Sequence, residues 1–162
     1  MAFKSVVESG DHKLWYFTLN AISVGKNGNN TRRSDVQLVQ FFLKKFYEQQ
    51  PYLRQVSGLS GIKIDGIAGE KTAKGIWWFQ HANSGIGNSI KVDGLVSVML
   101  GNGISSISST VYTILHLNRY FQMQGDGKEH HRNLEKHPDI IENAPELVAE
   151  LSKQTFDADR RV

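Results

Sequence analysis

Residues 64–72 read Ile-Asp-Gly-Ile-Ala-Gly-Glu-Lys-Thr, and residues 92–96 read Val-Asp-Gly-Leu-Val. Each stretch contains an Asp-Gly pair that follows a predicted helix. Glycine suits a turn position with a positive φ, and an aspartate side chain accepts hydrogen bonds from the backbone of its own turn. The two pairs therefore predict two tight turns of the same kind, in which the aspartates and glycines have a structural role.

Helical patterns lie on both sides of these turns. Apolar residues recur at helical spacing over residues 34–49, which predicts a first helix that ends before Pro51. The first turn leads into a second predicted helix at 70–82, where Glu70 in the first turn suits the helix dipole. A third helix is predicted at 110–123. Three helices connected by two similar turns are thus the predicted centre of the fold.

The two ends of the chain add further elements. Residues 13–24 are rich in strand formers and are predicted to form a β-hairpin with residues 3–8. At the other end, a charged loop at 124–137 precedes an amphipathic helix that begins at Pro138 and that Pro145 divides. The predicted fold class is mainly α (α+β), with an N-terminal β-hairpin, a three-helix core and a C-terminal helical extension.

The three helices and two turns resemble the peptidoglycan-binding domain family. That family pattern has an Asp-Val-x-x-Leu-Gln-type first helix, then Asp-Gly-x-x-Gly-x-x-Thr, then a helix that ends in Phe-Gln. Here the matching pieces lie at 35–40 (Asp-Val-Gln-Leu-Val-Gln), 65–72, 79–80 (Phe-Gln) and 93–94. The structural residues of the turn motif are Asp65, Gly66, Gly69, Thr72, Asp93 and Gly94.

The resemblance defines three parts of the chain. A peptidoglycan-binding-like domain is predicted at 34–117, with an N-terminal hairpin extension at 1–33 and a C-terminal helical extension at 118–162 on the same core. In the family pattern, the second turn runs straight into a helix start of the Gly-x-x-Thr type. Here residues 97–109 intervene before Thr110, so the binding edge near the third helix stays open at this point.

The resemblance also implies a function. It implies noncovalent binding of bacterial cell-wall peptidoglycan, through a groove near the first helix and the Asp-Gly loop. Family members are mostly fused to a hydrolase, and the stretches outside 34–117 are too short for one. We therefore expect a stand-alone, non-catalytic module that brings a separate enzyme or machine to the wall.

Large aromatic residues occupy helix positions that are polar or small in the family pattern. One interpretation is that the terminal extensions cover these rings in a larger core. The other is that a tryptophan stacks on a sugar ring and lines a shallow groove. The candidate ligand-binding residues are Trp77, Trp78, Gln80, Tyr52 and Arg54. A different class of function is a protein-interaction adaptor or a component of a secretion system or phage, whose partner surface would consist of Phe41, Phe42, Trp77 and Trp78.

Residues that carry out chemistry are few. The chain has no cysteine, which excludes disulfides, thiolate zinc sites and cysteine nucleophiles. The adjacent His130 and His131 lack the i, i+4 spacing of a zinc site on a helix, so we expect no metal and no cofactor. A small cell-wall hydrolase is a second alternative, and its carboxylates would come from Glu8, Glu48 and Glu70.

Charge and hydropathy give expectations about partners and location. The formal net charge is +3 with scattered basic residues, which does not favour nucleic acid. We expect peptidoglycan or a muropeptide as ligand, or a protein partner on an aromatic surface. Residues 1–24 lack a signal-peptide pattern, and the chain has no transmembrane run. The sequence therefore predicts a cytoplasmic protein, or one that reaches the envelope or periplasm by a non-classical route.

Overall fold

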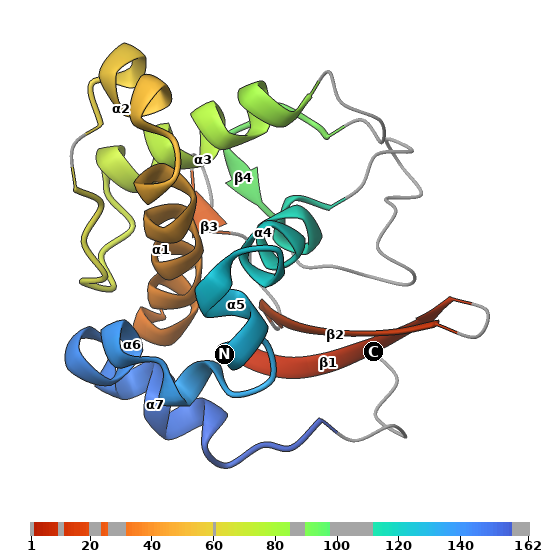
Figure 1. The fold of residues 1–162 in the computed structure, drawn as a ribbon. Helices are drawn as coiled ribbons and strands as arrows, with labels where there is room; N and C mark the ends of the chain where they lie inside the picture. The colour runs from red at the N-terminus through yellow and green to blue at the C-terminus, as the bar shows by residue number, and fades with distance from the viewer. Residues whose placement is uncertain are drawn as a thin grey trace.

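The computed structural model describes residues 2–9, 12–19, 24–25, 32–59, 61–84, 90–97 and 112–156. In these ranges the chain is mainly helical with a small antiparallel hairpin (Figure 1), as the sequence predicts. The helices are α1 (Arg33–Glu48), α2 (Pro51–Ser57), α3 (Glu70–Asn83), α4 (Thr113–Gln122), α5 (Gly125–His130), α6 (Pro138–Asn143) and α7 (Pro145–Leu151), with a 3₁₀ turn η1 (Leu134–Lys136). The strands are β1 (Ala2–Ser9), β2 (His12–Leu19), β3 (Val24–Gly25) and β4 (Leu95–Val96).

Helix α1 forms the centre of the fold. Most of its residues are buried, and Leu38, Phe41 and Leu43 are each 0% exposed. A helix buried to this extent must be covered by other elements on most of its sides. Helices α3, α4 and α7 and the hairpin pack against it, while α2 follows its C-terminal end and α6 and α7 lie near its N-terminal end (Figure 1). One continuous hydrophobic core joins all these elements.

The predicted hairpin is present, and a buried asparagine attaches it to α4. Strand β1 pairs with β2 in antiparallel register. Asn118 Oδ1 accepts the backbone N–H of Phe17 at 2.7 Å, and Asn118 Nδ2 donates to the carbonyls of Phe17 at 2.8 Å and Ile114 at 2.7 Å. Asn118 is 1% exposed. The backbone N–H and carbonyl of Phe17 are thus satisfied, although none of the described strands pairs with β2 on this side.

The C-terminal segment also packs on the hairpin. Lys4 is 5% exposed, and its Nζ donates to Glu135 Oε1 at 2.6 Å and to the carbonyl of Gln154 at 3.1 Å. The backbone N–H of Ala2 donates to Glu150 Oε2 at 3.1 Å. Both ends of the described chain therefore meet in one place, with the buried ammonium group paired as burial requires.

Two predicted details are wrong, and one helix was not predicted. The first helix ends before Pro51, as predicted, but a further helix follows at once, because proline suits the first position of a helix. The expected loop at 124–137 contains α5 and η1, and α5 approaches α4 so closely that a Cβ on Gly127 would collide with the carbonyl of Phe121. The third helix begins at Thr113 instead of residue 110. The predicted division at Pro145 is confirmed.

The described ranges contain no helix with the combination of length and apolar character that a bilayer span requires.

Candidate functional site: two matching turns and a pocket

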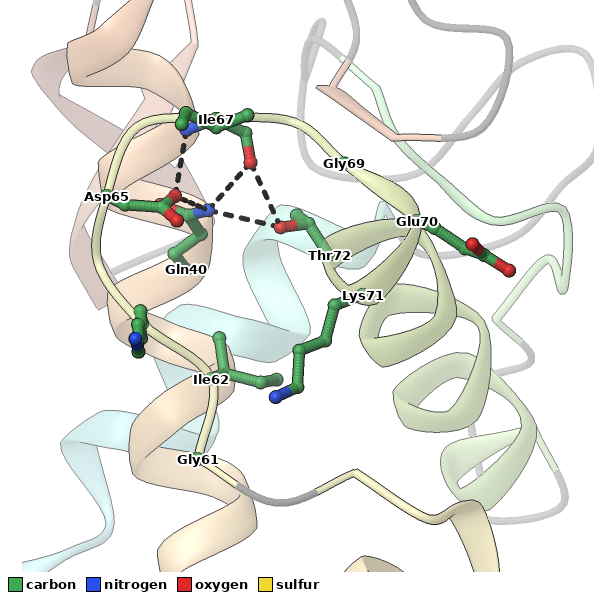
Figure 2. A pocket seen from close by; sticks show the side chains of 10 residues that line it. Gln40, Gly61, Ile62, Asp65, Ile67, Gly69, Glu70, Lys71 and Thr72 are labelled. Carbon is green, nitrogen blue, oxygen red and sulfur yellow. Dashed lines mark hydrogen bonds between the residues drawn. The ribbon is translucent and has the colours of Figure 1, made fainter.

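The first Asp-Gly turn is held by a glutamine from α1 (Figure 2). Gln40 is 2% exposed. Its Nε2 donates to Asp65 Oδ1 at 2.9 Å, to the carbonyl of Ile67 at 3.0 Å and to Thr72 Oγ1 at 3.1 Å. Its Oε1 accepts the backbone N–H of Gly66 at 2.9 Å. The whole amide of Gln40 is used to fix the turn and the start of α3.

The second turn repeats this arrangement with a glutamine from α3. Gln80 is 0% exposed. Its Nε2 donates to Asp93 Oδ1 at 3.1 Å, to the carbonyl of Leu95 at 2.9 Å and to Thr113 Oγ1 at 2.9 Å. Its Oε1 accepts the backbone N–H groups of Asp93 at 3.1 Å and Gly94 at 2.8 Å. Gln80 was a candidate ligand-binding residue, but the structure places it inside the core, where its amide holds the turn.

The backbone of the two turns is also alike. Gly66 and Gly94 both have a φ of 74°, as the sequence predicts. Within each turn the aspartate Oδ1 accepts the N–H two residues later, at 2.9 Å in both cases. The threonine that completes the second turn is Thr113, at the start of α4. Residues 98–111, which contain most of the intervening stretch, lie outside the described residues.

A pocket opens beside the first turn, between the loop that precedes it and the start of α3 (Figure 2). Its volume is about 340 Å³, and its lining residues are Gln40, Gly61, Ile62, Lys63, Asp65, Ile67, Gly69, Glu70, Lys71 and Thr72. The wall is well supported, since Gly75 of α3 lies against Ile62 and Leu43 with room for little more than a hydrogen atom. The pocket therefore has fixed walls even though it faces solvent.

Both signs of charge occur around this pocket. Lys63 and Lys71 supply ammonium groups and Asp65 supplies a carboxylate, whereas the side chain of Glu70 points away from the pocket (Figure 2). Ile67 adds an aliphatic surface that is 63% exposed. Such a lining can bind a small group that carries both an ammonium and a carboxylate, and it contains no nucleophile paired with a base.

Packing beside the pocket also involves Tyr47 of α1. Its hydroxyl donates to the carbonyl of Gly75 at 2.7 Å. Burial raises the pKa of Tyr47 well above its usual range, so this phenol is protonated and can donate at neutral pH. The hydrogen bond joins α1 to α3 directly behind the pocket.

The two tryptophans of α3 differ in exposure. Trp77 is 40% exposed and stacks on the exposed His81, with ring centroids 5.0 Å apart and planes within 9°. Trp78 is half-buried, packs against the core and meets Trp77 edge to face at 5.3 Å. Trp77 is therefore the ring that is more open to a ligand.

The other sequence-predicted residues do not form one surface with these rings. Tyr52 is 73% exposed, and it lies with the exposed Arg54 on α2. Phe41 and Phe42 are 0% and 1% exposed, with ring centroids 5.2 Å and 5.8 Å from Phe121 of α4. The proposed partner surface that included Phe41 and Phe42 is thus wrong, because the C-terminal part of the fold covers both rings.

The histidines of the C-terminal segment have structural contacts. The rings of His130 and His137 lie 4.8 Å apart, and His137 is 3% exposed. His137 Nδ1 accepts the backbone N–H of Asp139 and so caps α6. Within the described ranges, no group of three or more histidine, aspartate or glutamate side chains is placed to hold a metal ion.

Comparisons of the chain with protein-family models, with curated protein sequences and with solved structures find no match. The resemblance to the peptidoglycan-binding domain family thus stays a prediction that rests on the residues of the helices and turns. The sequence did not indicate Ile62, Lys63 or Lys71 as site residues. Their only signal is their position on either side of the first Asp-Gly pair.

Proposed function

We propose that this protein binds bacterial cell-wall peptidoglycan noncovalently, through the pocket beside the first turn. The observation that carries the proposal is the open pocket itself, in which ammonium and carboxylate groups lie on walls that Gln40 holds in place. Its position, between the first helix and the Asp-Gly loop, is where the resemblance implies a groove.

The chemistry of the ligand supports this proposal. The stem peptides of peptidoglycan carry free carboxylates, and their diamino acid residue supplies an ammonium group when it is not cross-linked. Lys63 and Lys71 are suited to the carboxylates, and Asp65 to the ammonium. Pairs of this kind give specificity and orientation more than raw affinity.

The proposed role is non-catalytic. The pocket offers charge and shape for recognition, and the protein would bring a separate enzyme or machine to the wall. Among the carboxylates considered for a hydrolase, Glu48 forms ion pairs with Lys44 at 3.2 Å and Lys45 at 3.4 Å, whereas Glu70 lines the pocket. The side chain of Glu8 lies outside the described residues.

A pull-down with washed, insoluble sacculi tests the proposal. We expect the purified protein to sediment with sacculi without reducing their turbidity, and Lys71→Glu, at a side chain that points toward the pocket, to weaken sedimentation sharply. Lys136→Glu makes the same charge change at another exposed helical position, in η1, and is expected to bind like the wild type. Equal binding by both variants would contradict the pocket assignment, and clearing of the suspension would favour the hydrolase.

A protein-interaction adaptor is the second candidate, and the exposed ring of Trp77 favours it. Next to Trp78 and His81 it forms an aromatic surface of the kind found in protein interfaces. This candidate predicts no sedimentation with sacculi, together with association in solution that Trp77→Ala removes. Size-exclusion chromatography with light scattering, applied to the wild type and to Trp77→Ala, measures self-association through this surface.

A further inference from the structure

The two residues that follow each Asp-Gly pair have a partner in one turn and none in the other. After the second pair, β4 pairs antiparallel with β3, and Gly25 lies opposite Leu95. After the first pair, the equivalent residues are Ile67 and Ala68, which are both exposed. None of the described strands pairs with them. The protein thus contains an occupied and an open copy of the same edge.

Hydrogen bonds within the turn decide which residue of the edge is open. The N–H of Ile67 donates to Asp65 Oδ1, and its carbonyl accepts from Gln40 at 3.0 Å, both on the inner side of the turn (Figure 2). In contrast, the backbone N–H and carbonyl of Ala68 form no hydrogen bond within the described residues. Exposed backbone groups of this kind are a template for an added extended chain.

The strand that occupies the second copy shows which residue type fits the edge. Gly25 has a φ of 124°, and a Cβ in the L configuration would collide there with the carbonyl oxygen of Gly94. That oxygen belongs to the backbone of the turn, and Gly66 of the first turn has the same φ of 74° as Gly94. A chain that pairs with the first turn in the same way therefore cannot carry an L side chain at the position of Gly25.

Glycine is not the only residue that adopts this backbone conformation. A D-residue has the mirror-image preferences of an L-residue, so its extended region lies at positive φ, between about 60° and 160°. Its Cβ also replaces the other α-hydrogen, away from the side on which an L-Cβ would meet the carbonyl oxygen. The open edge therefore accepts glycine or a D-residue opposite Ile67, and it disfavours an L-residue.

We propose that the first turn binds an extended peptide in which an L-residue precedes a D-residue, and that this peptide pairs with Ala68 as β3 pairs with β4. The inference rests on the proposed function, because stem peptides of peptidoglycan have such a pair. Their third residue has an L centre in the chain, and D-alanine follows it. The third residue takes the position of Val24, and D-alanine takes that of Gly25.

A peptide paired in this way lies on the rim of the pocket. Ile67 and Gly69, on either side of Ala68, both line it. The ammonium groups of Lys63 and Lys71 belong to the same lining, and they suit the terminal carboxylate of a peptide that ends in D-alanine. The lysines thus recognise charge and the edge recognises configuration, so the two contributions can be measured separately.

Calorimetric titration with two diastereomers tests the inference. The probes are the tetrapeptides L-Ala–γ-D-Glu–L-Lys–D-Ala and L-Ala–γ-D-Glu–L-Lys–L-Ala, which carry the same charges and differ only in the configuration of the last residue. We expect the D form to bind at least about tenfold tighter, because the L form either strains its backbone or leaves the edge unpaired. A third probe that ends in glycine is expected to bind about threefold more weakly than the D form, since glycine loses more conformational freedom.

Variants of one residue separate the backbone from the side chain. Ala68→Pro removes the N–H of the edge and is expected to reduce binding of the D form to the level of the L form. Ala68→Val is the matched control, because it keeps the N–H and introduces the residue that the second turn has at Val96. It should bind all three peptides like the wild type.

Hydrogen exchange gives a second readout on the wild type, which stays informative if Ala68→Pro does not fold. We expect saturation with the D form to slow exchange of the Ala68 amide at least about tenfold, since a paired N–H is protected from water. The L form at equal occupancy should leave this amide unprotected.

Three outcomes would overturn the inference. Equal binding of the two diastereomers would show that the edge does not select configuration. Equal binding of the D form by Ala68→Pro and Ala68→Val, or no protection of the Ala68 amide, would show that the backbone does not pair. In these cases, retention on sacculi that Lys71→Glu weakens would leave the proposed function standing. If no peptide binds and sacculi do not retain the protein, the proposed function fails as well.

Discussion

The first and second turns of this protein share their hydrogen bonds and their glycine backbone, yet they have different surroundings. In the first turn, Ile67 follows the Asp-Gly pair and is 63% exposed beside the pocket. In the second turn the equivalent residue, Leu95, is half-buried and begins β4, which pairs with Val24–Gly25 of β3. The backbone of Gly25 approaches that of Gly94 so closely that no side chain fits between them.

This difference separates the turn motif from the function. The Asp-Gly turn occurs twice, once open to solvent and once covered by β3. Its role in both places is structural, because in each turn a buried glutamine connects one helix to the next. The binding that we propose depends on exposed residues beside the first turn. The second turn is covered, so it leaves no room for exposed residues of this kind. A search for function in this fold should therefore follow the surroundings of the turn instead of the Asp-Gly pair.

The largest expected effect is at the covered turn. In Gly25→Ala, the new Cβ would collide with the carbonyl oxygen of Gly94 and lie 2.9 Å from Ile76 Cδ1, at a φ of 124°. We expect a loss of about 4 kcal/mol in the free energy of unfolding, or no folding at all. Gly61→Ala is the matched control, since Gly61 has a φ of 58° with nothing within 4 Å, and it should cost only about 1 kcal/mol. Similar urea midpoints for the two variants would contradict the account of the second turn.

The two glutamines allow a direct comparison. Gln80→Leu leaves the N–H groups of Asp93 and Gly94 and the carbonyl of Leu95 without their partner, in a site that water does not reach. We expect it to cost about 3 kcal/mol. Gln40→Leu removes an equivalent set of bonds beside an open pocket, where water replaces some of them, and should cost about 2 kcal/mol. Equilibrium unfolding in urea measures the free energy of unfolding of both variants. A larger loss for Gln40→Leu would contradict the assignment of the first turn as open and the second as covered.

The same distinction between covered and open groups applies to the ion pairs that hold the C-terminal helices. Asp139 pairs with Lys45 at 2.8 Å and Lys44 at 3.0 Å, and Lys45 is 8% exposed. Burial raises the pKa of Asp139, but hydrogen bonds and charge from Lys45 and Lys44 outweigh it and lower the pKa from 3.8 to about 2. Because the pKa of Asp139 is lower in the folded than in the unfolded protein, its ionised carboxylate stabilises the fold at pH values above the unfolded pKa. This stabilisation is lost as the pH falls from about 4 to about 2.

We therefore expect Asp139→Asn to cost about 1–2 kcal/mol at neutral pH and to flatten the loss of stability between pH 4 and pH 2. Glu146 serves as the open counterpart: its ion pair with Arg33, at 3.1 Å, joins side chains that are 43% and 54% exposed. Glu146→Gln should leave the unfolding midpoint at neutral pH within experimental error. Thermal unfolding as a function of pH tests both, and an unchanged acid profile in Asp139→Asn would show that this pair does not anchor α6.

The smallest effect on stability is expected at the open site. Trp77→Ala and Glu70→Gln remove exposed side chains, and each should change the free energy of unfolding by less than about 1 kcal/mol. Trp78→Ala should cost about 2 kcal/mol, because Trp78 packs against the core. Chemical unfolding of the three variants checks this order. A large loss for Trp77→Ala would mean that its ring supports the fold and is not free to serve a ligand.

Local features of the fold could be predicted from the sequence. The helix over 34–49, the hairpin and the two Asp-Gly turns depend on spacing and turn chemistry within short stretches, and all are present. The helix at Pro51 was missed because proline was taken only as a stop. The third helix was expected to begin at residue 110 and begins at Thr113, where its first threonine hydrogen-bonds Gln80, a contact that spacing alone does not show.

The candidate site was harder to predict, because it depends on contacts between distant parts of the chain. Gln80 looked like a ligand residue until Asp93 and Thr113 were seen to surround its amide. For Phe41 and Phe42 the sequence left two interpretations open, a core covered by the terminal extensions or a partner surface, and the first is confirmed because segments after residue 112 fold over both rings. The pocket itself exists only after Gln40 has fixed the first turn against α1.

The most direct test of this account is an NMR titration of the ¹⁵N-labelled protein with a soluble disaccharide-tetrapeptide of peptidoglycan. We predict that the amides of Ile67, Gly69 and Lys71, which line the pocket, shift together, while the amides of Gly94 and Leu95 do not move. The open turn would then be the ligand site and the covered turn its structural copy. Shifts centred on Gly94 and Leu95, or no shifts at millimolar ligand, would contradict the account.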